Sequence, residues 1–428
     1  MGIIIAILAL SFLIIIHELG HFLVAKAFKV RVNEFSLFMG PKLWSFQKGE
    51  TQYSLRLIPM GGYVKMEGEE ETSEDDRAFN KKPIGVRMAI IAAGPVMNIL
   101  VALIFGFIIV MNTGYSTNVV ESVNPGSVAE QAGIKAGDKF VKYNDSRLFM
   151  INDMELLSYP LGVNDPVTVE IERNGKTQTI EFTPDRNGGY KLGFTPKAAD
   201  GSVSREVQNV ASNSAAYKAG LKEDDKIVKL NDITVNSRQD IAEALNSIKG
   251  NEVTITVERD GQQMSLVPVI PEIGKNPEIY SMGLTFGAKE SGIADGIVQS
   301  INYNLSISRS IFLSFAWLFQ QVVPTSDMMG PIGITTTISD TVAVGESFTD
   351  KLINLLSITT LISINLGLLN LFPFPALDGS KIVLLAVEGI RKKPLAPEKE
   401  ALITMVGFVL LIMLLVYASF NDIVRIVR

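Results

Sequence analysis

The chain has 428 residues, with 39 Lys or Arg against 45 Asp or Glu, so its formal net charge is −6. Hydrophobic residues make up 47% of the sequence, which excludes an intrinsically disordered chain. The absence of cysteine excludes disulfides, thiolate metal sites and cysteine nucleophiles. A mild acidic balance without a basic block argues against nucleic acid as a partner.

Four stretches of the chain are mainly apolar over about 20 residues, the length that a helix needs to cross a bilayer. They lie at 1–25, 88–111, 352–372 and 401–420. The first is not expected to be a cleaved signal peptide, because no basic segment precedes it and no small-residue cleavage site follows it. A shorter apolar segment at 311–323 predicts an interfacial or packing helix. The pattern indicates a polytopic α-helical membrane protein with four transmembrane helices.

Basic residues predict how these helices are oriented. They gather after the first helix, before the second, and between the third and fourth. Because cytoplasmic loops carry an excess of Lys and Arg, these three segments are expected on the cytoplasmic side. Both termini and the long segment 114–350 are then expected outside the cytoplasm.

The predicted cytoplasmic region 28–85 has two parts. Residues 52–66 predict a β-hairpin or edge loop with Gly61 and Gly62 as its turn. Residues 67–76 include seven acids in ten positions, which predicts a solvated loop.

The predicted external region contains an internal repeat, in which 123–144 resembles 210–231 at an offset of 87 residues. Each copy continues into a helical segment and then a strand, a tight turn and a strand. The turns are Asn174-Gly175 and Asp260-Gly261, a strong hairpin signal. Similar segments, 190–194 and 280–284, are expected to close the copies. The repeat predicts two small α+β modules, at 115–198 and 199–288.

The sequence His17-Glu18-Leu19-Gly20-His21 lies inside the first apolar stretch. Residues four apart share a helical face, so the two imidazoles can bind one Zn²⁺ while the Glu acts on a metal-bound water. These are the only two histidines of the chain. Ionisable groups inside a membrane helix are costly and by default functional. The pattern predicts a zinc site; the alternative is a role in helix packing.

A catalytic zinc site needs a third protein ligand, which without Cys or further His must be Asp or Glu. Asp378 is favoured, because it follows the third helix at the expected cytoplasmic depth. Pro373 and Pro375 break the helix just before it, which suits a cavity. Asp378 could instead be a turn residue beside Gly379. Glu388 is the weaker competitor for the ligand role.

Three motifs together resemble the site-2 protease family: HELGH at 17–21, GPVMN at 94–98, and Asn365…Asn370…PFPALDG, ending at 379. The two modules resemble the tandem PDZ domains of the bacterial RseP/RasP type. MGGYVKM at 60–66 resembles the family's membrane-reentrant β-loop. The expected organisation is listed in chain order: transmembrane helix 1 at 1–27, the β-loop region at 28–85, helix 2 at 86–112, PDZ-like domains at 115–198 and 199–288, an amphipathic helix and linker at 289–350, helix 3 with the LDG motif at 351–390, and helix 4 at 399–422.

The resemblance implies an intramembrane zinc endopeptidase of regulated intramembrane proteolysis, active in stress responses. His17, His21 and Asp378 are then the Zn²⁺ ligands and Glu18 the catalytic base. The implied substrates are single-span membrane proteins, such as anti-sigma factors and remnant signal peptides. The protein is expected in the bacterial cytoplasmic (inner) membrane, with the PDZ-like domains extracytoplasmic and the active site toward the cytoplasm.

Substrate contacts are expected at a further set of residues: Asn365, Asn370, Pro373, Gly61 and Gly62. For the two asparagines, hydrogen bonding between membrane helices is the alternative. The PDZ-like domains are expected either to hold peptide ends or ectodomains, or only to exclude bulky substrates. A catalytically silent scaffold that binds partners through the PDZ pair is the alternative function. A transporter is disfavoured, because the repeat is not among the membrane helices.

Overall fold

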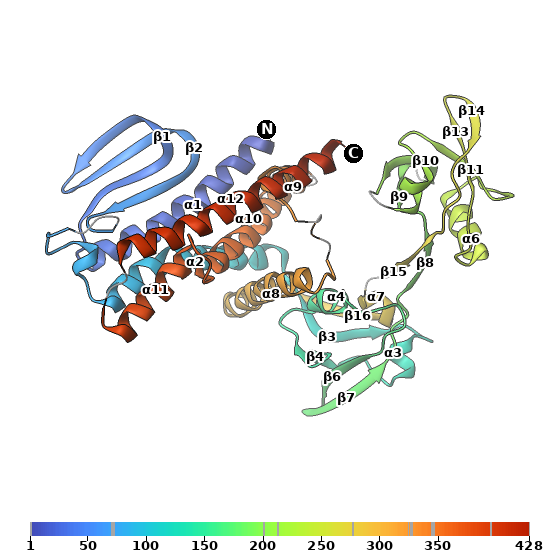
Figure 1. Ribbon diagram of the computed structural model, residues 1–428. Helices are drawn as coiled ribbons and strands as arrows, with labels where there is room; N and C mark the ends of the chain where they lie inside the picture. Colours follow the sequence, from blue (N-terminus) through green and yellow to red (C-terminus); the bar gives the residue numbers. More distant parts are fainter. Residues whose placement is uncertain are drawn as a thin grey trace. The chain divides into compact units, whose positions relative to one another are not determined.

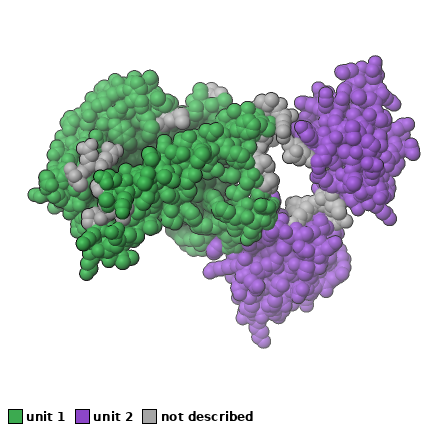
Figure 2. Space-filling model, viewed as in Figure 1, with its two compact units in different colours: residues 1–115, 288–427 green, residues 116–287, 428 purple. Residues whose placement is uncertain are grey.

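The computed structural model describes residues 2–69, 73–199, 202–211, 214–275, 278–323, 325, 328–343, 347–393 and 396–427 (Figure 1). The chain forms two compact units (Figure 2). Residues 1–115 and 288–427 form the first, here called the helical unit, and residues 116–287 form the second, here called the module unit.

Among its described residues, the helical unit contains four helices that are long and apolar enough to cross a membrane, as predicted. They are α1 (Gly2–Ala27), α2 (Ile84–Thr113), α10 (Phe348–Leu371) and α12 (Pro397–Val427). The other described helices of this unit are η1 (Phe79–Lys81), α8 (Ile293–Phe319), α9 (Pro331–Ala343) and α11 (Asp378–Arg391). The short helix expected at 311–323 is in fact the last part of the longer α8, which ends at Phe319, and residues 320–323 lie beyond it.

Helix α2 packs against α1 on one side and α10 on another, and glycines allow the close approach. A Cβ added to Gly20 of α1 would collide with the backbone carbonyl of Ala93 on α2. A Cβ on Gly367 of α10 would lie 2.9 Å from the carbonyl oxygen of Pro95. The three helices therefore meet backbone to backbone at the level of residues 93–95.

The β-loop is formed by two long antiparallel strands, β1 (Val32–Lys48) and β2 (Thr51–Met66). Both strands bend, so that Phe35 pairs with Tyr53 and also with Val64. The sheet therefore has four strips, in the order 42–48, 51–56, 34–37 and 62–66.

The turn predicted at Gly61 and Gly62 is wrong. The reversal of the hairpin lies at residues 49–50, and both glycines lie within β2, where it comes back alongside β1. Gly61 has a φ of +80°, a conformation that favours glycine and here serves a bend within a strand. A Cβ on Gly62 would lie 2.8 Å from the backbone oxygen of Ser36.

The acidic segment 67–76 is only partly a solvated loop, and residues 70–72 lie outside the described residues. Asp75 accepts a hydrogen bond of 3.1 Å from Arg31. The ammonium of Lys381 on α11 donates to Glu69 over 3.1 Å. These ion pairs hold the segment against the helical unit, which composition alone does not reveal.

Among its described residues, the module unit contains two six-stranded sheets whose strands follow a corresponding order. The first is β16-β3-β4-β6-β7, with β5 pairing β4, and the second is β14-β13-β11-β10-β9, with β12 pairing β11. The strands of the first sheet are β3 (Tyr115–Val123), β4 (Lys139–Tyr143), β5 (Ser146–Arg147), β6 (Val167–Arg173), β7 (Lys176–Phe182) and β16 (Leu284–Lys289). Those of the second are β9 (Phe194–Ala199), β10 (Ser202–Val210), β11 (Lys226–Leu230), β12 (Ile233–Thr234), β13 (Ile255–Arg259) and β14 (Gln262–Ser265). The helices of the first module are α3 (Val128–Gln131), α4 (Asp153–Ser158) and α7 (Glu278–Met282). Those of the second are α5 (Ala215–Ala219) and α6 (Arg238–Ile248).

The two modules are nested, and not consecutive as the boundaries 115–198 and 199–288 assumed. Leu192 is buried in the core of the second module, whereas Met282 and Leu284 are buried in the core of the first. The closing segments of the repeat therefore belong to the opposite modules from those expected. The chain leaves the first module through β8 (Asn187–Lys191) and returns through β15 (Glu272–Lys275), and these two strands pair with each other.

The repeat is visible in an equivalent ion pair in each module. Arg173 donates two hydrogen bonds of 2.6 Å to the carboxylate of Asp138. Arg259 donates to Asp225 in the same way, over 2.6 and 2.7 Å. Both aspartates are 1% exposed. In the first module the pair joins the residue before β4 to the end of β6, and in the second it joins the residue before β11 to the end of β13.

Burial acts to raise the pKa of Asp138, but hydrogen bonds from Arg173 and from the backbone N–H of Lys135 outweigh it and hold this pKa below its ordinary value. The charged carboxylate thus stabilises the fold above a pH of about 4, the unfolded pKa, and this contribution is lost as the pH falls through the lower folded pKa. We expect Asp138→Asn to destabilise the first module by about 2 kcal/mol at pH 7.

The difference from the parent should shrink in acid. Hydrogen exchange of core peptides from the first module, corrected for intrinsic rates, measures it. Glu121→Gln is the control, because Glu121 lies exposed on β3 of the same module. An equal loss at pH 7 and pH 3 would contradict the assignment of the effect to this carboxylate.

Candidate metal centre

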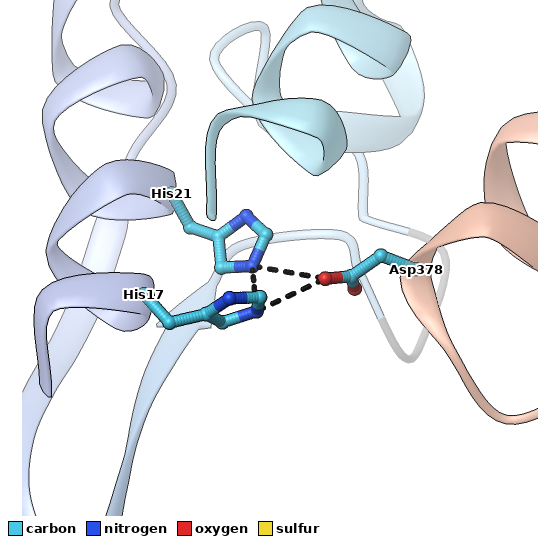
Figure 3. A group of neighbouring side chains, drawn as sticks. All are labelled: His17, His21 and Asp378. Carbon is cyan, nitrogen blue, oxygen red and sulfur yellow. Dashed lines mark hydrogen bonds and ion pairs between the residues drawn. The ribbon is translucent and has the colours of Figure 1, made fainter. Parts of the chain in front are cut away.

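Three side chains from two distant segments converge in the helical unit (Figure 3). His17 and His21 lie one turn apart on α1, and Asp378 is the first residue of α11. Oδ2 of Asp378 lies 3.0 Å from Nε2 of His17 and 3.5 Å from Nε2 of His21. The two Nε2 atoms are 3.2 Å apart.

These separations fit ligands of one zinc ion. Bonds of about 2.0–2.1 Å in tetrahedral geometry place ligand atoms about 3.3 Å from one another. The three observed distances lie on both sides of this value. Two imidazoles and one carboxylate leave a fourth position for water, as in catalytic rather than structural zinc sites.

His21 is oriented by the backbone of α2. Its Nδ1 lies 2.8 Å from the carbonyl oxygen of Ile90. Since a carbonyl can only accept, Nδ1 carries the proton and the lone pair of the neutral ring is on Nε2, which faces the other two side chains of the cluster.

Gly94 leaves the space that the imidazoles occupy. A Cβ at this position would collide with Nε2 of His21 and would lie 2.8 Å from Nε2 of His17. The following Pro95 lies inside α2, where a proline removes one backbone hydrogen bond and favours a kink. Gly94-Pro95 therefore lies within α2 and does not begin it.

Asp378 is positioned by the break between two helices. Helix α10 ends at Leu371, and Pro373 and Pro375 cannot continue it. Ala376 has a φ of +76°, which is rare for a residue with a side chain and indicates a tightly determined loop. At the start of α11, Asp378 also lies where the helix dipole favours a negative charge.

Glu18 lies near the three converging side chains but does not belong to the cluster that they form. It is half-buried on α1 next to His17. A Cβ on Gly62 of β2 would lie 3.6 Å from Cγ of Glu18, so the β-loop passes next to this side chain.

The competing ligand Glu388 is excluded by its own partner. Arg87 donates two hydrogen bonds to its two carboxylate oxygens, one of them over 3.2 Å. Asn365 and Asn370 lie half-buried on α10, and Pro373 lies exposed in the loop before Asp378. None of these three belongs to the metal cluster, and their contact with substrate stays a prediction.

Asn98, the last residue of the GPVMN motif, lies beside the cluster, and sequence reasoning assigned it no role. It is fully buried on α2, and its amide lies 3.2 Å from Nδ1 of His17. The available signal was its position one helical turn after Gly94, which places both on one face of α2.

We expect Gly94→Ala to lower zinc affinity at least tenfold, because the added methyl group occupies space held by both Nε2 atoms. Zinc per chain after dialysis against a graded chelator series measures this. Gly85→Ala on the same helix is the matched control, because no atom lies within 4 Å of its added Cβ. Full zinc retention by Gly94→Ala would contradict the described geometry.

Comparison with known proteins shows which family the chain belongs to. The family model of peptidase family M50 matches residues 5–414. The regulator of sigma-E protease RseP of Escherichia coli is 31% identical over 450 residues, covering 98% of this chain and 97% of the relative. The regulator of sigma E protease of Haemophilus influenzae is 31% identical over 448 residues, covering 98% of both chains. The chain therefore belongs to peptidase family M50, the site-2 protease family, and is a membrane zinc metalloprotease.

Proposed function

We propose that this metalloprotease cuts peptide bonds within the membrane-spanning segments of single-span proteins. The observation that carries the proposal is the position of its ligand set. His17 and His21 lie inside a helix long and apolar enough to cross a membrane, and Asp378 follows another. A hydrolytic centre at this depth can act on bonds within a bilayer.

Zinc, when bound by His17, His21 and Asp378, supplies an activated water and polarises the scissile carbonyl. Glu18 takes the proton of the attacking water and delivers it to the leaving amine. The Nδ1 hydrogen bond of His21 to Ile90 holds that imidazole in place throughout. Asn370, and less directly Asn365, donate hydrogen bonds to the substrate backbone or to the developing oxyanion.

A substrate helix must be extended before attack, because its carbonyls are held in its own hydrogen bonds. The strip 62–66 of β2 supports a way to hold an extended segment. It pairs with 32–37 on one side, and Gly62 lies next to Glu18. Addition of the substrate as a further strand on the open side would bring its backbone to the catalytic base. Gly61 and Gly62 give this part of the strand its bend and its close approach.

The charge pattern supports a cytoplasmic position for the active site. Basic residues follow α1, precede α2 and lie between α11 and α12, so these segments are assigned to the cytoplasmic side. The module unit then lies outside the cytoplasm. The named relatives are regulators of sigma E, which supports a bacterial inner-membrane location, a role in stress responses, and substrates such as anti-sigma factors and remnant signal peptides.

The two modules, which we assign as PDZ-like domains, are proposed to select substrates from outside. Strands β16 and β9 are edge strands of their sheets, and an extended peptide can add to such an edge. Alternatively, the two modules exclude substrates with bulky ectodomains by their volume alone. A silent scaffold is the less supported function, because only metal chemistry requires two imidazoles, a carboxylate and a neighbouring Glu18 in this arrangement.

The catalytic assignment is tested by Glu18→Gln, with cleavage of a model transmembrane substrate by purified protein in proteoliposomes. We expect zinc to be retained and cleavage to fall by about 10³-fold, because general-base catalysis is lost. Asp378→Asn should lose zinc and activity together. Glu388→Gln is the control for loss of another acid on α11, and it should keep its zinc. Unchanged cleavage by Glu18→Gln would refute its role as base.

The role of the second module is tested by excising it. Because Asn187 pairs with Lys275, residues 188–274 can be replaced by Asn-Gly, which forms a two-residue hairpin turn. If the module excludes substrates by volume, the excised protein will cleave substrates with a folded ectodomain and keep its rate on short ones. If the module instead binds substrate peptides, the excised protein will cleave short substrates more slowly than the parent. An intact preference for short ectodomains at an unchanged rate would exclude both roles for this module.

A further inference from the structure

Asn98 has a hydrogen-bonding environment that packing between helices does not explain. Its side chain is fully buried, and Nδ2 lies 3.2 Å from Nδ1 of His17. Its Oδ1 is also buried and has no hydrogen-bond partner. The hydroxyl of Ser363 on α10 donates to the backbone oxygen of Asn98 over 2.8 Å. The contact of Asn98 with α10 therefore uses its backbone, whereas its side chain faces α1.

The amide orientation can be decided from the ring that it faces. A neutral imidazole that offers the lone pair of Nε2 to a metal carries its proton on Nδ1. The Nδ2 group of Asn98 is also a donor, so two donors would face each other. The oxygen and nitrogen of an amide have nearly the same shape, and their assignment follows from the hydrogen-bond network. Exchange of the two atoms places Oδ1 against Nδ1 of His17 and gives the unpaired oxygen its partner.

We propose that Asn98 is a positioning residue for the zinc site, which accepts a hydrogen bond from Nδ1 of His17 through its side-chain oxygen. This bond fixes the tautomer and the ring orientation of His17, as the carbonyl of Ile90 does for His21. Helix α2 then provides the outer hydrogen-bond partner of both imidazoles. The inference rests on the proposed ligand role of His17.

The test uses the full chain in detergent micelles, loaded with zinc and titrated with a chelator. Asn98→Leu keeps the size of the side chain without an acceptor, and we expect a 10- to 100-fold loss of zinc affinity. Asn98→Asp keeps only acceptor atoms, and we expect it to hold zinc within about threefold of the parent or more tightly. Asn304→Leu is the matched control, because this amide is also buried at a helix contact, on α8, and has an unpaired Oδ1. It should lower the melting temperature without changing zinc affinity.

A spectroscopic measurement separates positioning from general loss of structure. With only two histidines in the chain, ¹⁵N-histidine labelling gives four ring-nitrogen signals. We expect one protonated Nδ1 signal to shift in Asn98→Leu, and none to shift in Asn304→Leu. Zinc retention by Asn98→Leu at the parent level would overturn the proposal, and so would equal zinc loss by Asn98→Asp and Asn98→Leu, because the amide N–H would then be the group that matters.

Failure of the zinc site itself would look different. In that case the parent binds no zinc, or His17→Ala binds it as tightly as the parent. Either result overturns the ligand assignment and this inference with it. A parent that binds zinc through His17, together with an Asn98→Leu variant that binds it equally well, overturns only the inference about Asn98.

Discussion

The structure depends on the close contact of three apolar helices at one level of the helical unit. The imidazoles of α1 can meet the carboxylate of α11 only if α2 allows both segments near it. Glycines make this possible, because Gly20, Gly94 and Gly367 each lie where a methyl group would collide with a neighbouring backbone or ring. In lipid, where apolar surface between helices gives little driving force, such close packing is a main source of association.

Helix α2 positions the side chains of the candidate metal centre, although none of the three comes from this helix. Ile90, Gly94 and Asn98 follow one another at intervals of four residues, so they form one stripe on the helix. The carbonyl of Ile90 orients His21, Gly94 makes room for both rings, and the amide of Asn98 faces His17. A ligand set preorganised in this way can hold a metal with little rearrangement, which is what a catalytic zinc site requires.

The nesting of the modules means that the first module is built from two segments of the chain, one before and one after the second module. The second module is inserted between β7 and α7 of the first, so the first sheet is completed only after the second module has been passed. At the base of the insertion, Arg186 and Glu278 form a fully buried ion pair, which Tyr143 joins by donating to the carboxylate. Because a buried charge left without its partner is costly, this pair holds together the outgoing and returning strands of the chain.

The sequence alone determined what depends on local spacing. Four residues between His17 and His21 fix both rings on one helical face, and the length of an apolar run fixes whether a helix can span a membrane. Tertiary structure decided what depends on contacts between distant segments. Asp378 was favoured over Glu388 by sequence, but only the pairing of Glu388 with Arg87 excludes the competitor. The dipeptide Gly61-Gly62 is compatible both with a turn and with a bend inside a strand, so its sequence does not distinguish the two. The segments 190–194 and 280–284 have similar apolar patterns, so either could pack into either module. Which module each one joins is therefore decided by packing.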